Sequence, residues 1–79
     1  MERKEILARL KRVLAVIKPK LDLDSVQEES PLTTGLGLDS LSMLLTGLAI
    51  ESEFGIRFEP PVPPVKVSDV VDYIMMKLV

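Results

Sequence analysis

The residues of this 79-residue chain best suited to carry chemistry are a serine and an aspartate that follow two glycines. They stand in the stretch Gly35-Leu36-Gly37-Leu38-Asp39-Ser40-Leu41, directly before a long apolar segment without helix breakers. Glycine favours a turn and Asp or Ser favours a helix cap, so this order predicts a loop that leads into a helix. Free backbone N–H groups and the positive end of the helix dipole would then stabilise a phosphate ester on the Ser40 hydroxyl.

A simpler interpretation is that Asp39 and Ser40 only cap the helix and that Gly37 only makes the turn. Capping is the most frequent role of Asp and Ser at such places. The residue types alone leave both interpretations open.

The composition excludes several other kinds of chemistry. The chain has neither cysteine nor histidine, which removes disulfides, thiolate nucleophiles, the usual general base and the commonest metal ligands. A chain this short can also hardly enclose a substrate cleft. We therefore expect a protein that is not an enzyme, with no catalytic residues and no metal site, in which any reactive group belongs to an added cofactor.

The pentapeptide Gly37-Leu38-Asp39-Ser40-Leu41 resembles the Gly-x-Asp-Ser-Leu signature of the acyl carrier proteins. Three further features are similar to that family: the chain length, an amphipathic first helix followed by a long loop, and the closing stretch Val70-Val71-Asp72-Tyr73-Ile74. The resemblance covers most of the chain and is specific at the serine.

This resemblance implies a covalent 4'-phosphopantetheine on Ser40, whose terminal thiol holds acyl groups as thioesters. It also implies that Asp39 helps to position metal-bound coenzyme A during loading and that Leu41 contacts the loading enzyme. The implied partners are a phosphopantetheinyl transferase and the acyl-transferring or condensing enzymes of fatty-acid, polyketide or related biosynthesis. Two alternatives are a peptidyl or aminoacyl carrier and a small helical module that only binds other proteins.

The first helix is predicted over residues 2–17, where apolar side chains recur at i, i+3, i+4 and i+7. Glu5 and Arg9 are spaced to form an ion pair on it, and Pro19 follows its end. Residues 18–39 show no helical period, so we expect a long connection ordered by leucines tucked under the helices.

The second helix is predicted over residues 40–54 and carries two apolar stripes on nearly opposite sides. One consists of Met43, Gly47, Ile50 and Phe54, and the other of Leu41, Leu44, Leu45 and Leu48. Periodicity alone favours the leucines as the core. The resemblance instead places them beside the prosthetic group, on the partner-binding surface. Ser42 and Leu45 stand where acidic residues are frequent in the family.

The third part of the chain is rich in proline, with Pro60, Pro61, Pro63 and Pro64. Prolines remove backbone donors and disfavour the helical region for the preceding residues, so at most a single helical turn is expected there. Ser68 is predicted to cap a last helix, with Asp69 in its first turn. That helix should run to about Leu78 and face inward through Val70, Val71, Ile74 and Leu78.

Together these elements predict an all-α fold: a small four-helix bundle of acyl-carrier-protein type with a short or degraded third helix, forming one domain over residues 1–79. Most of the ten basic side chains lie in the first 20 residues, and the remainder of the chain is acidic. This asymmetry could orient partners during encounter. We expect a cytoplasmic monomer that does not span a membrane and does not bind nucleic acid.

Overall fold

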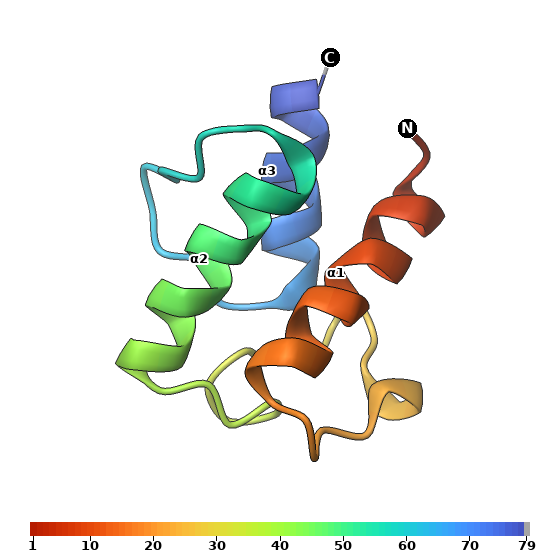
Figure 1. Cartoon of the computed structure of the whole chain (residues 1–79), viewed down its shortest axis with the longest axis vertical. Helices are drawn as coiled ribbons and strands as arrows, with labels where there is room; N and C mark the ends of the chain where they lie inside the picture. Colours follow the sequence, from red (N-terminus) through yellow and green to blue (C-terminus); the bar gives the residue numbers. More distant parts are fainter. Residues whose placement is uncertain (79) are drawn as a thin grey trace.

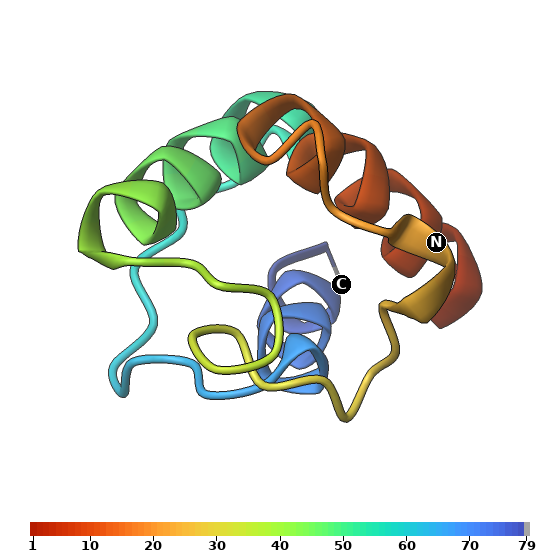
Figure 2. The same ribbon diagram turned by 90° about the horizontal axis from the view of Figure 1, so that it is seen from below.

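The computed structural model describes residues 1–78, which contain three α-helices, one short 3-10 helix and no β-strand. These are α1 (Arg3–Ile17), η1 (Leu23–Ser25), α2 (Ser40–Phe54) and α3 (Val67–Leu78). Seen along one axis of the molecule, α1 and α2 lie over α3, and two long connections run beside it (Figure 2). The helices are joined in the order shown in Figure 1. The prediction of a small helical fold is confirmed.

Helix α1 supplies one wall of the core and packs against both α2 and α3. Its inward stripe follows the predicted period, with buried Ile6, Leu10, Val13 and Leu14. The predicted pair of Glu5 with Arg9 is wrong, because Arg9 is used between helices. Its Nε lies 2.7 Å from Glu53 Oε2, and its guanidinium lies over the Phe54 ring. Arg9 therefore joins α1 to the end of α2.

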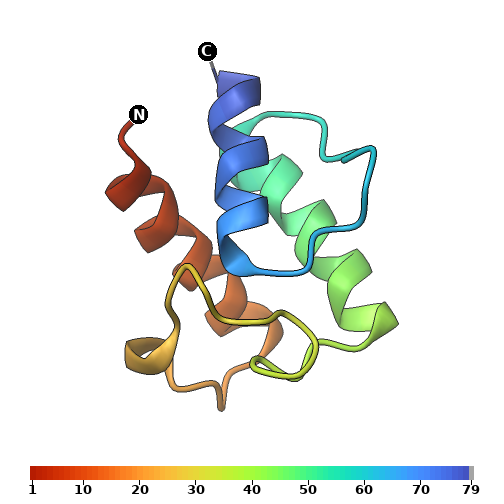
Figure 3. The same ribbon diagram turned by 180° about the vertical axis from the view of Figure 1, so that it is seen from behind.

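The connection over residues 18–39 is ordered as predicted. Val26, Leu32, Leu36 and Leu38 are buried in the common core. Its backbone also pairs with the segment before α3: the Leu32 amide donates to the Val65 carbonyl over 2.9 Å, and the Val67 amide donates to the Ser30 carbonyl over 3.0 Å. Figure 3 shows the two connections meeting at the start of α3. These bonds fix the base from which α2 begins.

Helix α2 turns its leucines outward. Leu41, Leu44, Leu45 and Leu48 are 43–64% exposed, whereas Ile50 and Phe54 are buried. The prediction of a leucine core from periodicity alone is wrong, and the register implied by the resemblance is correct. The physical reason is that α1 and Phe58 pack on the other side of α2, where Gly47 permits close approach. Within residues 1–78, no helix packs over the leucine side, which is why these side chains stay exposed.

Residues 55–66 form an extended connection without a helix. The expectation that residues 60–64 are not helical is confirmed. The four-helix detail of the predicted bundle is not: the described residues have no third helix between α2 and α3, not even one turn. The dense prolines account for this, since each removes a backbone donor that a helix would need.

Helix α3 begins at Val67, two residues earlier than a cap at Ser68 predicts. Ser68 does not cap it, because Ser68 lies inside the first turn and donates its amide to the Glu28 carbonyl. The carboxylate of Asp69 instead accepts the amides of Val65 and Lys66, over 2.9 and 3.0 Å. Val70, Val71 and Ile74 are buried as predicted, but Leu78 is 36% exposed and the inward prediction for it is wrong.

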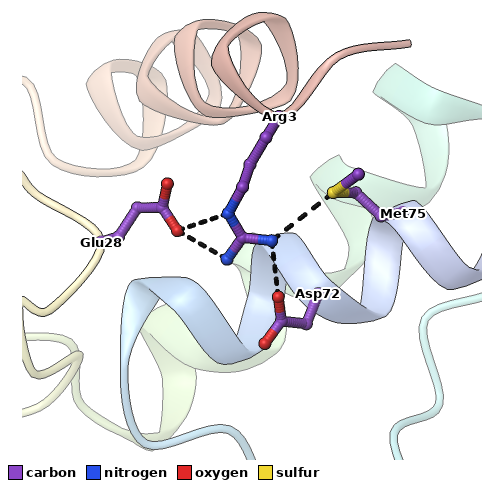
Figure 4. Close-up of polar contacts among 4 residues, drawn as sticks. All are labelled: Arg3, Glu28, Asp72 and Met75. Atoms are coloured by element: carbon purple, nitrogen blue, oxygen red, sulfur yellow. Dashed lines mark hydrogen bonds and ion pairs between the residues drawn. The ribbon is translucent and has the colours of Figure 1, made fainter.

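Arg3 connects three parts of the molecule that are distant in sequence (Figure 4). Its guanidinium donates to Glu28 of the long connection and to Asp72 of α3, each over 2.6 Å, and touches the sulfur of Met75. The hydrogen bonds to Glu28 and then Asp72 raise the pKa of Arg3 above its ordinary value. The start of α1 is thereby fixed to α3.

Candidate functional site

Ser40 is the first residue of α2, and its side chain is exposed. The chain reaches it through a tight turn in which Gly37 adopts a φ of 70°, a left-handed conformation that favours glycine. Leu38 is buried immediately afterwards, and its amide donates to the Leu32 carbonyl over 3.1 Å. Ser40 therefore lies on the surface two residues after a firmly anchored position.

Asp39 is the N-cap of α2, as the sequence predicted for this pair of residues. Its side chain accepts the Ser42 amide over 2.8 Å. Hydrogen bonds from Ser42 are the main reason that the pKa of Asp39 is lowered, and the positive charge of Lys18 lowers it further. Asp39 is consequently ionised at neutral pH.

The start of α2 offers unpaired donors beside the Ser40 hydroxyl. Among the described residues, the amides of Ser40 and Leu41 have no backbone acceptor, whereas the Met43 amide already donates to the Asp39 carbonyl. Free amides and the helix dipole at such a position stabilise a phosphate group. The residues present therefore fit a phosphodiester attached to Ser40.

Lys18 is a contributor to this site that the sequence did not reveal. It follows the last residue of α1 and is close enough to Asp39 for its charge to act on that carboxyl group. This positive charge favours the ionised form of Asp39, although the two side chains form no ion pair among the described residues. Only the fold brings residues 18 and 39 together, so no local motif could have predicted it.

The four exposed leucines of α2, Leu41, Leu44, Leu45 and Leu48, form what we call the leucine patch. It begins at the residue after Ser40 and continues along the helix. Contiguous apolar patches of this kind on small domains commonly mark binding surfaces. The structure thus brings the predicted attachment and partner-binding residues together on one helix.

Two features are absent from residues 1–78. No three His, Cys, Asp or Glu side chains are grouped closely enough to hold a metal ion. None of the helices described has both the length and the apolar character needed to cross a membrane.

Comparison with known proteins defines the class of this small domain. Residues 4–62 match the family described as a phosphopantetheine attachment site. The chain is 36% identical over 80 residues to the acyl carrier protein of Thermotoga maritima, covering 96% of this chain and 95% of that protein. It is also 39% identical over 59 residues to an acyl carrier protein of Saccharopolyspora erythraea, covering 75% of this chain but 61% of that relative.

The chain belongs to the acyl carrier protein family. Its cofactor is 4'-phosphopantetheine, which is attached covalently in this family. Proteins of the family carry groups for other proteins and are generally not enzymes. The resemblance noted in the sequence is confirmed at the level of the family.

Proposed function

We propose that this protein carries acyl groups as thioesters on a 4'-phosphopantetheine arm attached to the Ser40 hydroxyl. The observation that supports this most directly is the exposed position of Ser40 at the start of α2, beside unpaired amides, in a chain of this family. The bound arm supplies a mobile thiol, which the chain itself lacks because it has no cysteine. It presents its cargo to enzymes of fatty-acid, polyketide or related biosynthesis.

In the proposed loading step, Ser40 Oγ forms a new bond to phosphorus as the bond to the nucleotide portion of coenzyme A breaks. The hydroxyl proton goes to a base of the phosphopantetheinyl transferase, because this chain has no histidine to accept it. The ionised Asp39 helps to position the metal-bound coenzyme A. No residue of this chain is catalytic in this account, and it needs no metal site of its own.

The leucine patch is the proposed binding surface for the transferase and for the acyl-transferring or condensing enzymes. Leu45 and Ser42 replace acids that are frequent in the family, so partner contact here is apolar to an unusual degree. Basic side chains of α1 provide long-range steering instead. Dedicated partners should therefore present an apolar surface flanked by acidic groups.

Intact-mass measurement tests the carrier function. The chain is incubated with coenzyme A and a broad-specificity transferase, and a gain of one phosphopantetheine group is expected. A chain that never gains this mass would instead be an interaction module that uses the leucine patch.

A second reaction separates an acyl carrier from a peptidyl or aminoacyl carrier. The loaded chain is offered to an acyl-transferring enzyme and, separately, to an aminoacyl-adenylating enzyme. Charging by the first enzyme only is the proposed result, and charging by the second only would contradict it.

A further inference from the structure

The interior beneath the start of α2 is apolar and almost completely filled. The residual cavity has a volume of about 10 Å³, no more than a single water molecule requires. Residues of the helices, of the long connection and of the proline-rich connection all contribute to its wall; those used below are Leu38, Met43, Gly47, Ile50, Phe58 and Val70. Leu38 and Met43 stand two residues before and three residues after Ser40, so this space lies beneath the residues that flank the proposed arm.

Phe58 is partly buried and packs against this interior from the side of the proline-rich connection. Its ring lies directly against α2 at Gly47: a β-carbon added there would be 3.3 Å from Phe58 Cδ2. The one residue of α2 without a side chain thus accommodates the aromatic ring. The ring thus lies between Gly47 of α2 and Tyr73 of α3.

Several contacts hold Phe58 in this position. Its amide donates to Glu51 Oε2 over 2.9 Å, and its ring packs edge-on against the Tyr73 ring with a centroid distance of 5.2 Å. The Tyr73 hydroxyl accepts the amide of Glu59 over 3.1 Å and donates to the carbonyl of Arg57 over 3.2 Å. The residues before and after Phe58 are therefore both fixed to α3.

We propose that Phe58 closes the interior and that an acyl chain carried at Ser40 remains outside the core of this protein. This inference rests on the proposed function and specifies its cargo. An apolar tail that stays in water gains nothing from the carrier, and each added methylene makes its exposure less favourable. The cargo that fits such a carrier is a short or polar acyl group.

The closure can be tested without any attached cargo. Benzene or xenon is titrated into the unmodified protein while the methyl NMR signals of Ile50 and Val70 are followed, since such probes enter dry apolar cavities. The wild-type signals should not move, whereas those of Phe58→Ala should shift to saturation. Val62→Ala is the matched control, because Val62 lies in the same connection but is 72% exposed. Saturable shifts in the wild type would overturn the proposal.

Phe58→Leu replaces Phe58→Ala in the titration if far-UV circular dichroism shows that the alanine variant does not fold. It keeps an apolar side chain but vacates part of the ring volume, so the probe should bind more weakly than in Phe58→Ala and still measurably.

Tyr73→Phe tests separately whether the Tyr73 hydroxyl holds the residues around Phe58 in place. It retains the ring and loses only the hydroxyl, so it should raise the amide exchange rates of Arg57, Phe58 and Glu59. Unchanged exchange together with an unchanged Phe58→Leu response would contradict the closure.

The loaded protein gives the decisive comparison. Wild type and Phe58→Leu are loaded with arms carrying acetyl, butyryl, hexanoyl and octanoyl groups, and loading is verified by intact mass. In the wild type, Tm and the core methyl shifts should not change with chain length. In the variant, Tm should rise and the shifts should grow as the chain lengthens.

The possible failures of this experiment are distinguishable. A wild-type core that responds to the octanoyl group overturns the closure while the carrier function stands. A protein that gains no arm at all contradicts the proposed function, and the benzene titration still decides the closure.

Discussion

Asp39 and Asp69 are carboxylates that stabilise the starts of two different helices, Asp39 from the position before α2 and Asp69 from inside the first turn of α3. Each carboxylate accepts backbone amides at a helix start, from Ser42 in one case and from Val65 and Lys66 in the other. These hydrogen bonds lower the pKa of both groups below the ordinary aspartate value. The stabilisation is fully present above the unfolded pKa of about 3.9 and is lost as the pH falls through the lower folded pKa.

Asp69→Asn should accordingly reduce the pH dependence of stability in acid. At pH 7 the variant should unfold at a lower urea concentration than the wild type, because the charged acceptor is gone. As the pH falls below the unfolded pKa of about 3.9, the difference should shrink, since the wild type loses the same charge. Glu29→Gln is the control, because Glu29 is exposed and makes no side-chain hydrogen bond among the described residues. A constant difference across this pH range would contradict the assignment.

The two sides of α2 should respond differently when a side chain is shortened to alanine, as measured by the free energy of unfolding. Ile50 is fully buried, so Ile50→Ala should lower the free energy of unfolding by about 2–5 kcal/mol. Leu48 is 56% exposed, so Leu48→Ala should change it by about 0.5 kcal/mol or less. Urea denaturation of both variants checks this. Equal losses would mean that the leucine patch is part of the core.

Leu45→Glu tests the proposed use of the leucine patch. Because Leu45 is 43% exposed, a charge there should leave the thermal transition nearly unchanged. Losing partial burial of one leucine in a complex corresponds to about 1 kcal/mol, so binding to the transferase should weaken several-fold. The dissociation constant is measured by calorimetry with Ser52→Glu, an exposed position farther along α2, as the control. A collapsed thermal transition would place Leu45 in the core, and unchanged binding would remove it from the interface.

The helices and the proline-rich connection could be predicted from local sequence, because apolar spacing and missing amide donors act over a few residues. Local sequence does not predict which side of α2 faces the core. Its leucines fit the helical period as well as Met43 and Ile50 do. Tertiary contacts decide between the two stripes, namely the packing of α1 and of the Phe58 ring on the side that contains Gly47. The prediction that Ser68 caps α3 is wrong for a related reason. The helix already begins at Val67, so Ser68 lies within its first turn, and it is the Asp69 side chain that accepts backbone amides there, those of Val65 and Lys66.

The candidate site was predictable only in part. The signature predicts that Ser40 and Asp39 lie at the helix start, and the resemblance predicts that the leucines face outward. Lys18 and the closure by Phe58 depend on how distant segments meet, so no motif contains them.

For the whole molecule, Arg3 is the residue that links the most distant parts of the chain. Arg3→Met keeps the apolar stem and removes the charge, so it should lower Tm by separating α1 from Glu28 and Asp72. The Tm difference from wild type should become smaller at high salt, because salt screens partly exposed ion pairs. Arg57→Met is the control, since the pair of Arg57 with Glu59 is largely exposed and local. A salt-independent difference would show that Arg3 acts through packing alone.

The attachment of the arm to Ser40 is the central claim, and intact mass spectrometry of three proteins tests it most directly. Wild type, Ser40→Ala and Ser52→Ala are each incubated with coenzyme A and a broad-specificity transferase, after circular dichroism has verified that all three are helical. The wild type and Ser52→Ala should gain one phosphopantetheine group, and Ser40→Ala should gain none. A folded Ser40→Ala protein that still acquires the arm would contradict the account.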